Sequence, residues 1–453
     1  MTNKLVIYNT LTRKKDLFKP IKGKKVNLFV CGPTVYDFSH IGHAKTYVQF
    51  DVIVKYLKFL GFKVFYLQNV TDIDDKIIQR AKNEKKDTLK LAKEFEKEYL
   101  NDMKSLGVDS IDKFARATDY IKEIESQVLR LIKKGYAYKI DDGYYFNLKK
   151  FKEYGKLARR TVQEAEDGVS RIDENVGKIN KGDFCLWKFH KEGEPSWNSK
   201  LGKGRPGWHI EDTAITEKEF GAQYDIHGGA VDLIFPHHEA EIAQMEAISG
   251  KKPLVKYWIH TAFLNIDKEK MSKSKGNFVT IKEALENYNG KVVRFLFASN
   301  HYREKINFSF DKLEEAKNAL ERINEFARKV KNSKEKDDAE LLMKTEKDFI
   351  EAMNDDFNTS RAFEVIFNFI RKVNKKGGGK GSYNLIKKFD EIFNILNIIE
   401  IKIPKEVKDL AEKREIFRKE KRWKDADNMR NKIGKLGYII EDKEGNGFVI
   451  KKR

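Results

Sequence analysis

The chain has 453 residues, of which 35% are charged, and its formal net charge is +20. That length is enough for about three domains with cores of their own. Because we find no apolar run of membrane-spanning length and no apolar signal segment, and because Cys31 and Cys185 are the only cysteines, we expect a cytoplasmic protein without a disulfide scaffold. The positive charge favours a polyanionic partner, which by charge alone is either nucleic acid or an acidic membrane surface.

The first recognisable unit is a strand, a helix and a second strand between residues 26 and 76. Residues 26–31 form a short apolar run rich in β-branched and aromatic side chains, which predicts a buried strand. A Gly-Pro-Thr break follows, and from His40 to about Gly61 apolar residues recur every three or four positions, as in a helix. Residues 63–67 predict the second strand. Such a unit points the N–H groups and the positive dipole of its helix at a phosphate, so it predicts a nucleotide site.

The helix opens with His40-Ile41-Gly42-His43, which places two imidazoles on one side of its first turn. Both can donate hydrogen bonds to a polyphosphate, and Gly42 leaves room for a flat nucleotide against the backbone. A pair of this spacing on its own is more often two surface histidines, so the interpretation needs a partner elsewhere in the chain.

Polar residues 69–76 follow the second strand, at the end where open α/β sheets bind their ligands. Amphipathic helices continue to about residue 135, and short strands with a charged loop then predict an insertion. The sequence therefore predicts an α/β fold, with a Rossmann-like parallel-sheet catalytic domain. Its predicted parts are residues 1–135 (first half), 136–205 (connective insertion) and 206–309 (second half).

Helical patterns replace strands after residue 309, and the sequence predicts a helical bundle over residues 310–400. Within it, residues 377–382 read Gly-Gly-Gly-Lys-Gly-Ser, which predicts a flexible break. A small basic C-terminal domain is predicted over residues 401–453. It begins near Pro404, contains a cationic helix that includes residues 413–432, and ends in short extended pieces.

A second candidate phosphate-binding element is the loop Lys270-Met271-Ser272-Lys273-Ser274. Its two lysines can bring ammonium groups onto a developing pyrophosphate. In a chain this rich in lysine, the alternative is a solvated basic loop. Together with the histidine turn, however, the loop matches the two signature motifs of class I aminoacyl-tRNA synthetases in the right order, and the chain resembles that class.

Longer stretches resemble the cysteinyl-tRNA synthetase family in particular, and the resemblance covers nearly the whole chain. They are residues 31–37, 69–76, 207–211, 227–229 and 235–244. The resemblance implies that L-cysteine is activated by ATP to cysteinyl-adenylate and that the cysteinyl group passes to the 3′-terminal adenosine of tRNA(Cys).

The resemblance also implies roles for single residues. ATP, with Mg²⁺ bridging its phosphates, would contact His40, Gly42 and His43, while Lys270 and Lys273 would act on the departing pyrophosphate. The amino-acid pocket would be lined by Cys31, Thr71, Trp208 and His227. For Trp208, an ordinary core tryptophan is an equal alternative.

In that family a zinc ion, held by two Cys, one His and one Glu, binds the thiol of the substrate. Cys31, His237 and Glu241 match three of these ligands, but Asp212 stands at the position of the second cysteine. Aspartate is a competent zinc ligand, and His237 and Glu241 share a face of a predicted helix. We therefore expect one Zn²⁺ held by Cys31, Asp212, His237 and Glu241.

Three alternatives to this zinc site remain open. Taken alone, a cysteine in a strand is more often a small buried apolar residue than a ligand. The metal could be lost, with cysteine selected by shape and hydrogen bonds. Cys185, in the predicted insertion, could also stand in as a ligand.

The basic tail favours RNA over a membrane. Trp423 and Asp427 are four residues apart on one face of the cationic helix, with Arg430 beside them. Stacking on an unpaired base together with hydrogen bonds to its edge is how single-stranded RNA loops are read. The resemblance assigns this unit to anticodon binding, whereas the alternative for such a charge run is a solvated face. We expect a monomer that binds tRNA(Cys), L-cysteine and ATP.

Two other functions remain open. A cysteine ligase of the same fold that acylates a small amino-sugar acceptor would not need the basic, aromatic C-terminal unit. A non-catalytic RNA-binding relative would need neither the histidine turn nor the lysine loop.

Overall fold

The computed structural model of the chain describes residues 4–160, 177–266, 269–270, 278–398, 403–442 and 447–452. The chain divides into two compact units, residues 1–396 and 397–453. Within the described part, no helix is both long and apolar enough to cross a membrane.

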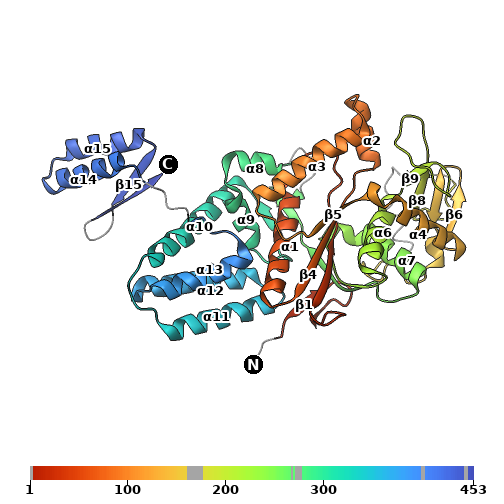
Figure 1. The fold of residues 1–453 in the computed structure, drawn as a ribbon, viewed down its shortest axis with the longest axis horizontal. Helices are drawn as coiled ribbons and strands as arrows, with labels where there is room; N and C mark the ends of the chain where they lie inside the picture. The colour runs from red at the N-terminus through yellow and green to blue at the C-terminus, as the bar shows by residue number, and fades with distance from the viewer. Residues whose placement is uncertain are drawn as a thin grey trace. The chain divides into compact units, whose positions relative to one another are not determined.

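A five-stranded parallel sheet forms the centre of the first unit (Figure 1). In the order β11-β10-β3-β4-β5, its strands are β11 (Val255–Thr261), β10 (Tyr224–Ala230), β3 (Lys25–Val30), β4 (Lys63–Val70) and β5 (Lys113–Arg116). The chain builds outward from β3 on one side and from β10 on the other. The topological switch point therefore lies between β3 and β10, where sheets of this kind bind ligands. The predicted α/β parallel-sheet fold is confirmed.

Helix α1 (Ile41–Phe59) follows β3 and begins at the predicted histidine turn, with His40 as its N-cap. Fourteen of its 19 residues are buried, because it packs against the sheet and against helices of the bundle. Such a helix buries polar side chains as well as apolar ones, and each of these needs a partner.

Other elements of the first half flank this strand–helix–strand unit. They are β1 (Val6–Asn9), β2 (Lys14–Leu17), α2 (Asp75–Asn83), α3 (Thr88–Ser105), the 3₁₀ turn η1 (Ala117–Tyr120) and α4 (Ile121–Lys133).

The insertion is a four-stranded antiparallel sheet in the order β6-β7-β8-β9. Its strands are β6 (Ala137–Ile140), β7 (Gly143–Phe146), β8 (Phe184–Phe189) and β9 (Gly204–Pro206), with the 3₁₀ turn η2 (Leu148–Lys150) after β7. Lys188 and Arg205 pair with Asp75 at 2.6 and 2.5 Å, so two strands of the insertion are fastened to the start of α2.

The second half supplies the helices and strands around the switch point. They are α6 (Trp208–Phe220), the short turns η4 (Val231–Leu233) and η5 (Ile234–His238), α7 (Glu239–Ser249), β12 (Leu264–Ile266), β13 (Glu269–Lys270), α8 (Ile281–Asn287), α9 (Gly290–Ala298) and β14 (Ile306–Phe308). Strand β12 pairs with β13 and with β14, so these three strands form a small separate sheet.

A bundle of long helices completes the first unit: α10 (Phe310–Lys331), α11 (Ala339–Asn354), α12 (Thr359–Lys376) and α13 (Lys380–Phe393). The predicted flexible break at residues 377–382 is wrong, since α13 already begins at Lys380. The carboxylate of Asp337 accepts the N–H groups of Gly379, Gly381 and Ser382 and the Ser382 hydroxyl, at 2.6 to 2.9 Å. This carboxylate holds the glycine-rich turn in place.

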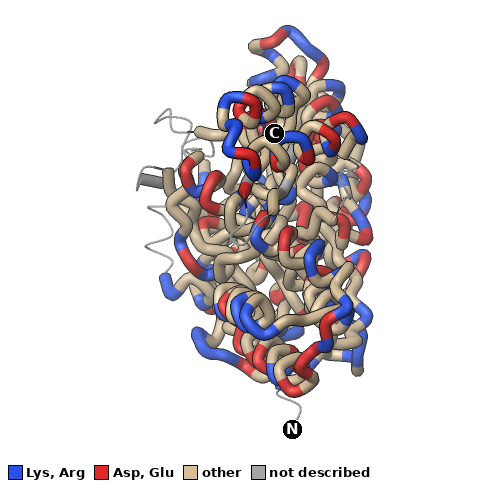
Figure 2. Tube along the Cα trace, turned by 90° about the vertical axis from the view of Figure 1, so that its left-hand side faces the viewer, with Lys and Arg blue, Asp and Glu red and all other residues tan. Residues whose placement is uncertain are grey.

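The second unit contains α14 (Lys405–Lys419), α15 (Trp423–Lys435) and the antiparallel pair β15 (Tyr438–Asp442) and β16 (Phe448–Lys452). The prediction of one cationic helix is wrong, because the chain turns between Glu420 and Arg422, with Lys421 at a φ of 60°. Along the helices, basic and acidic residues are interspersed rather than separated (Figure 2).

Candidate active site

The two histidines of the predicted turn cap helix α1 and stack on each other. Their ring centroids are 3.7 Å apart and the rings are 16° from parallel. The Nδ1 atom of His40 accepts the backbone N–H of His43, and Nδ1 of His43 accepts that of His40, both at 3.3 Å. Because Nδ1 accepts in each ring, a neutral ring carries its proton on Nε2, where it can donate to an anion. The helix N-terminus adds a positive dipole at the same place.

Cys31 directly follows β3, next to the switch point, and its main chain is bonded to helix α1. The Tyr47 hydroxyl, one helical turn after His43, donates to the Cys31 carbonyl at 3.3 Å. The Gly32 N–H donates to the Asn69 side chain at 2.5 Å, and a Cβ at Gly32 would lie 1.8 Å from the Asn69 carbonyl oxygen. Only glycine fits there, so β3 and β4 approach closely just where Cys31 turns into the crevice.

The predicted metal ligands lie together and are buried. One donor atom each from Cys31, Asp212, His237 and Glu241 falls within 4.8 Å of the others. His237 Nε2 is 3.0 Å from Asp212 Oδ2 and 3.1 Å from Glu241 Oε1, and Cys31 Sγ is 4.0 Å from Glu241 Oε1. The residues come from the end of β3, from α6, from turn η5 and from α7. Because η5 runs directly into α7, the fold joins three separate segments of the chain at this point.

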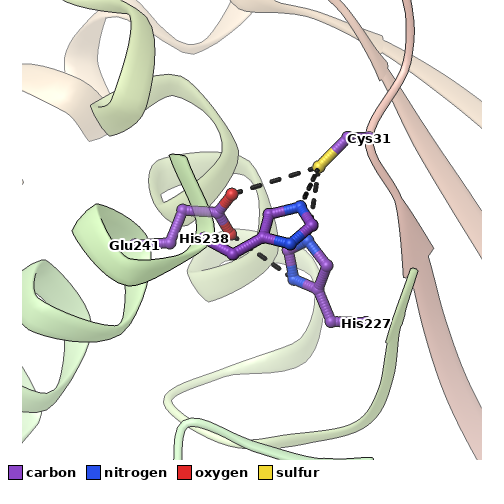
Figure 3. A group of neighbouring side chains, drawn as sticks. All are labelled: Cys31, His227, His238 and Glu241. Atoms are coloured by element: carbon purple, nitrogen blue, oxygen red, sulfur yellow. Dashed lines mark hydrogen bonds and ion pairs between the residues drawn. The ribbon is translucent and has the colours of Figure 1, made fainter. Parts of the chain in front are cut away.

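A second group of donors shares two of these side chains (Figure 3). Cys31 Sγ is 3.3 Å from His227 Nε2 and 3.2 Å from His238 Nε2, and His227 Nδ1 is 3.4 Å from Glu241 Oε2. Figure 3 shows all four side chains pointing toward one another. Cys31 and Glu241 therefore lie between a carboxylate–imidazole pair on one side and two imidazoles on the other.

Further buried side chains orient the donors. Asn69 Nδ2 donates to Asp212 Oδ1 at 2.6 Å. His237 Nδ1 is 2.8 Å from His209 Nδ1, and His238 Nδ1 is 2.8 Å from His260 Nε2. Contacts of this kind fix the tautomer and direction of a metal-binding side chain.

Burial controls protonation in this cluster. It raises the pKa of the Cys31 thiol well above the usual value, and the carboxylates of Asp212 and Glu241 raise that pKa further. It raises the pKa of Glu241 in the same way, with Asp212 adding to the effect. For His227 and His238, burial lowers the pKa well below 6.5, so both imidazoles are neutral at pH 7.

These residues fit a divalent cation. Within the described residues, the ion-pair partners of Asp212 and Glu241 are histidines, and no lysine or arginine neutralises either carboxylate. Asp212 raises the pKa of Glu241, and both carboxylates raise the pKa of the Cys31 thiol, so the three groups need a positive charge nearby to be anionic together. Sulfur, imidazole nitrogen and carboxylate oxygen are the ligand atoms of zinc sites.

Three further predicted residues lie around this cluster. The buried hydroxyl of Thr71 donates to Glu211 Oε2 at 2.9 Å. Trp208 is 41% exposed and stacks on the His237 ring at 4.4 Å and 17°, so it is not an ordinary core tryptophan. Cys185 is buried in β8 and belongs to neither donor group.

The lysine loop is described in part. Lys270 ends strand β13, whereas Lys273 lies outside the described residues. The chain after the loop returns to the start of α1, since His40 forms a β-bridge with Thr280 and the Ile41 N–H donates to the Val279 carbonyl at 2.9 Å. In the second unit, Trp423, Asp427 and Arg430 are all exposed on α15.

Sequence reasoning missed three buried contributors: His209, His238 and His260. His209 and His238 lie in stretches that carry the family resemblance and His260 does not, but spacing alone gave no reason to assign any of them a role. The available signal was a histidine inside an otherwise apolar run, as in Tyr257-Trp258-Ile259-His260. A buried histidine needs a partner for each ring nitrogen, so it indicates a polar cluster.

Comparisons with known proteins assign most of the chain to known families. Residues 17–318 match the family described as tRNA synthetases class I (C) catalytic domain. Residues 348–399 match the DALR domain, and residues 402–449 match the cysteinyl-tRNA ligase anticodon binding domain.

Full-length relatives are similar throughout. A cysteine–tRNA ligase of Thermoplasma volcanium is 47% identical over 97% of this chain and 98% of its own length. The one from Caldicellulosiruptor saccharolyticus is 42% identical over 96% and 97%. Among solved structures, Mycobacterium tuberculosis methionyl-tRNA synthetase in complex with methionyl-adenylate has a TM-score of 0.62 at 16% identity, covering 82% of this chain and 89% of that one. At that identity, the likeness shows the fold alone.

Proposed function

The chain belongs to the cysteine–tRNA ligase family of class I tRNA synthetases, and we infer that it makes cysteinyl-tRNA in two steps. L-cysteine and ATP first give cysteinyl-adenylate and pyrophosphate. The cysteinyl group then passes to the 3′-terminal adenosine of tRNA(Cys). The observation that supports this most is the buried sulfur, nitrogen and oxygen cluster at the end of β3, directly before the helix that the two stacked imidazoles open.

For the first step, we assign His40 and His43 to the ATP phosphates. Their Nε2 protons and the α1 dipole supply fixed positive charge, and Gly42 admits the nucleotide close to the backbone. Lys270 and Lys273 are assigned to the departing pyrophosphate, with Mg²⁺ bridging the phosphates. The reaction gains most from positioning and charge stabilisation, because no covalent intermediate with the protein is needed.

For amino-acid selection, we propose that Cys31, Asp212, His237 and Glu241 hold a zinc ion. Bound there, zinc would supply a Lewis acid that favours the thiolate form of the substrate cysteine. The donor set and its burial support the assignment. His227 and Thr71 would line the amino-acid pocket, and Trp208 would cover it beside His237.

For the second step, we propose that α15 contacts the anticodon of tRNA(Cys). Trp423 is 58% exposed, which leaves its ring available to stack on a base, and Asp427 and Arg430 can bond to base edges. The match of residues 402–449 to an anticodon binding domain supports this role. The alternative acceptor, a small amino sugar, has no support from the comparisons.

The decisive experiment is cysteine-dependent exchange of pyrophosphate into ATP by the full-length protein, repeated with serine. We expect exchange with cysteine and at least about 100-fold less with serine, since metal–sulfur bonding adds to what shape alone can discriminate. Absence of exchange with cysteine would contradict the proposed function. Equal exchange with serine would contradict selection by a thiol-binding metal.

A separate measurement tests the metal. Elemental analysis of protein purified without chelator is expected to give about one zinc per chain, because the donor atoms of the four proposed ligands lie close enough together to hold a single ion. Full activity in protein that contains no zinc would refute the assignment of these ligands, while leaving the overall reaction intact.

A further inference from the structure

Lys45 is a buried lysine of helix α1, in the turn that follows His43, and it is 1% exposed. Its ammonium donates to the carbonyl of Ala262 at 2.8 Å and to that of Tyr302 at 3.3 Å. A third bond, at 3.1 Å, goes to the side-chain oxygen of Gln49, one turn further along the helix. All three acceptors are neutral.

Burying an ammonium among neutral acceptors lowers the stability of the folded protein. Among the described residues, no carboxylate lies within ion-pairing distance of Lys45, although an ammonium in a protein interior is normally paired. Burial lowers the pKa of Lys45 to about 7, against a smaller opposing effect of Glu304. Methionine would fill the same volume without this cost. An ionisable side chain kept under such conditions beside the proposed nucleotide site indicates a functional task.

The two carbonyls lie just before the two parallel strands of the small sheet, β12 and β14. Ala262 lies between β11 and β12, and β12 pairs with β13, which ends at Lys270. Tyr302 precedes β14, the other neighbour of β12. The Ala262 N–H also donates to the Tyr302 carbonyl at 2.9 Å. One ammonium therefore ties both parallel strands of the small sheet, just before they begin, to helix α1.

Neighbouring contacts hold the chain on both sides of the lysine loop close to helix α1. The Thr46 and Thr261 hydroxyls are 2.9 Å apart, which holds the end of β11 against the same helical turn. On the far side of the loop, the Ile281 N–H donates to the Ser39 carbonyl at 2.9 Å. The chain is thus fixed to α1 both before β12 and after residue 278.

We propose that Lys45 is a positioning residue for cysteine activation: it sets the β12–β13 arm, which carries Lys270, at a fixed offset from the histidines of α1. The inference rests on the proposed function, in which Lys270 and the two histidines act on the same triphosphate. Lys45 itself touches no substrate. Its effect comes through the main chain that it holds.

The test is the substitution Lys45→Met in the full-length protein, measured by cysteine-dependent pyrophosphate exchange. We expect kcat to fall about 10- to 100-fold and KM for ATP to rise, because a displacement near 1 Å costs rates of that order. KM for cysteine should stay within about twofold, since the donor cluster is untouched. The melting temperature should be no lower than that of the wild type, because the substitution removes an unpaired buried charge.

Two further variants separate positioning from folding. Lys45→Arg keeps the charge and the donors and should restore most of the lost kcat. Tyr56 lies in the same helix as Lys45, and its hydroxyl donates to Asn354 of α11. Tyr56→Phe removes this bond, so it tests whether any loosening of α1 has the same effect. It should leave KM for ATP unchanged. A folded Lys45→Met protein with kcat and KM for ATP within twofold of the wild type would overturn the proposal. So would an activity loss that simply follows a lower melting temperature.

Hydrogen–deuterium exchange decides the question independently of activity. In the Lys45→Met protein we expect faster exchange at residues 262–266 and 302–308 than in the wild type, with the rest of the sheet unchanged. Unchanged exchange in both segments would overturn the inference, even if the wild type proved inactive. An inactive wild type would by itself count only against the proposed function.

Discussion

At the scale of single residues, Asp212 is the most informative departure from the family pattern. By the family resemblance, its carboxylate stands in place of a cysteine thiolate. It would keep the negative charge but would offer a harder ligand atom to the proposed zinc ion. It also needs a donor for its second oxygen, which Asn69 supplies at 2.6 Å. Because the same Asn69 side chain accepts the N–H of Gly32, it links the segments of two proposed ligands, Cys31 and Asp212.

The first prediction concerns this link. Asn69→Ala should weaken zinc binding about 10- to 100-fold, the usual effect of losing a contact behind a ligand. Asp212→Cys should tighten zinc binding, because sulfur is the better zinc ligand, and the thiol needs no partner from Asn69. The measurement is competition with a chromogenic chelator. If Asn69→Ala costs the same in the Asp212→Cys background as in the wild type, the two side chains are not coupled.

The second prediction concerns pH and Lys45. Burial lowers the pKa of Lys45 from 10.5 to about 7, so between these values the unfolded chain binds a proton that the folded chain does not. The free energy of unfolding should therefore rise between pH 7 and pH 9.5 by about 3 kcal/mol more in the wild type than in Lys45→Met. Urea unfolding at pH 7 and pH 9.5 checks this. Parallel curves for the two proteins would contradict it.

The role of a single residue could be predicted only where a sequence motif or the family resemblance points to it. The four proposed metal ligands follow from the family resemblance, not from spacing, since Asp212 and His237 are far apart in sequence. Lys45 and Asn69 have roles that depend on which main-chain atoms lie beside them. Those atoms come from segments many residues away, so no local pattern reveals them.

At the scale of elements, helix α1 is held by polar contacts as well as apolar packing. The side chains of Asp51 in α1 and Arg294 in α9 are fully buried and pair at 2.5 Å. Arg294 also donates to the carbonyls of Gly107 and Phe393, at 2.9 and 2.5 Å. This one guanidinium thus connects the ends of α3 and α13 with two other helices of the first unit.

The third prediction follows from that pair. Arg294→Met should lower the free energy of unfolding of the first unit by about 3–5 kcal/mol, because it leaves a buried carboxylate without its main partner. The double substitution with Asp51→Asn should recover part of the loss. Denaturant unfolding measures both. As a control, Lys312→Ala removes an exposed pair with Glu315 and should cost less than about 0.5 kcal/mol.

Elements were predictable where side-chain periodicity sets them. The strands near residues 26–31 and 63–67 and the start of α1 followed from apolar patterns. The two errors have different physical causes. In the glycine-rich turn, a carboxylate from the segment before α11 orders a sequence that looks flexible. In the basic tail, a turn at Lys421 divides a run whose composition favours a continuous helix.

At the scale of the whole molecule, the residues proposed for activation and those proposed for anticodon binding fall in separate compact units. The proposed ATP and amino-acid residues all lie in residues 1–396, and the proposed anticodon residues lie in 397–453. Losses in one step should therefore leave the other measurable.

The fourth prediction tests this separation. Trp423→Ala should raise KM for tRNA about 10- to 100-fold, the value of one stacked base, and leave pyrophosphate exchange unchanged. Leu436→Ala is the matched control, since it truncates another exposed apolar side chain of the same unit and should alter neither step. A fall in pyrophosphate exchange for Trp423→Ala would show that the two units do not act independently.

The donor cluster contains a single thiol, so oxidation cannot form a disulfide within it. Two thiolates side by side, once stripped of their ion, can close a disulfide that only a reductant reopens. Cys31 instead faces carboxylates and imidazoles, and without an ion its sulfur stays protonated and slow to react. If a chelator removes the proposed zinc ion, no disulfide can form within the cluster, and added zinc alone should refill the site.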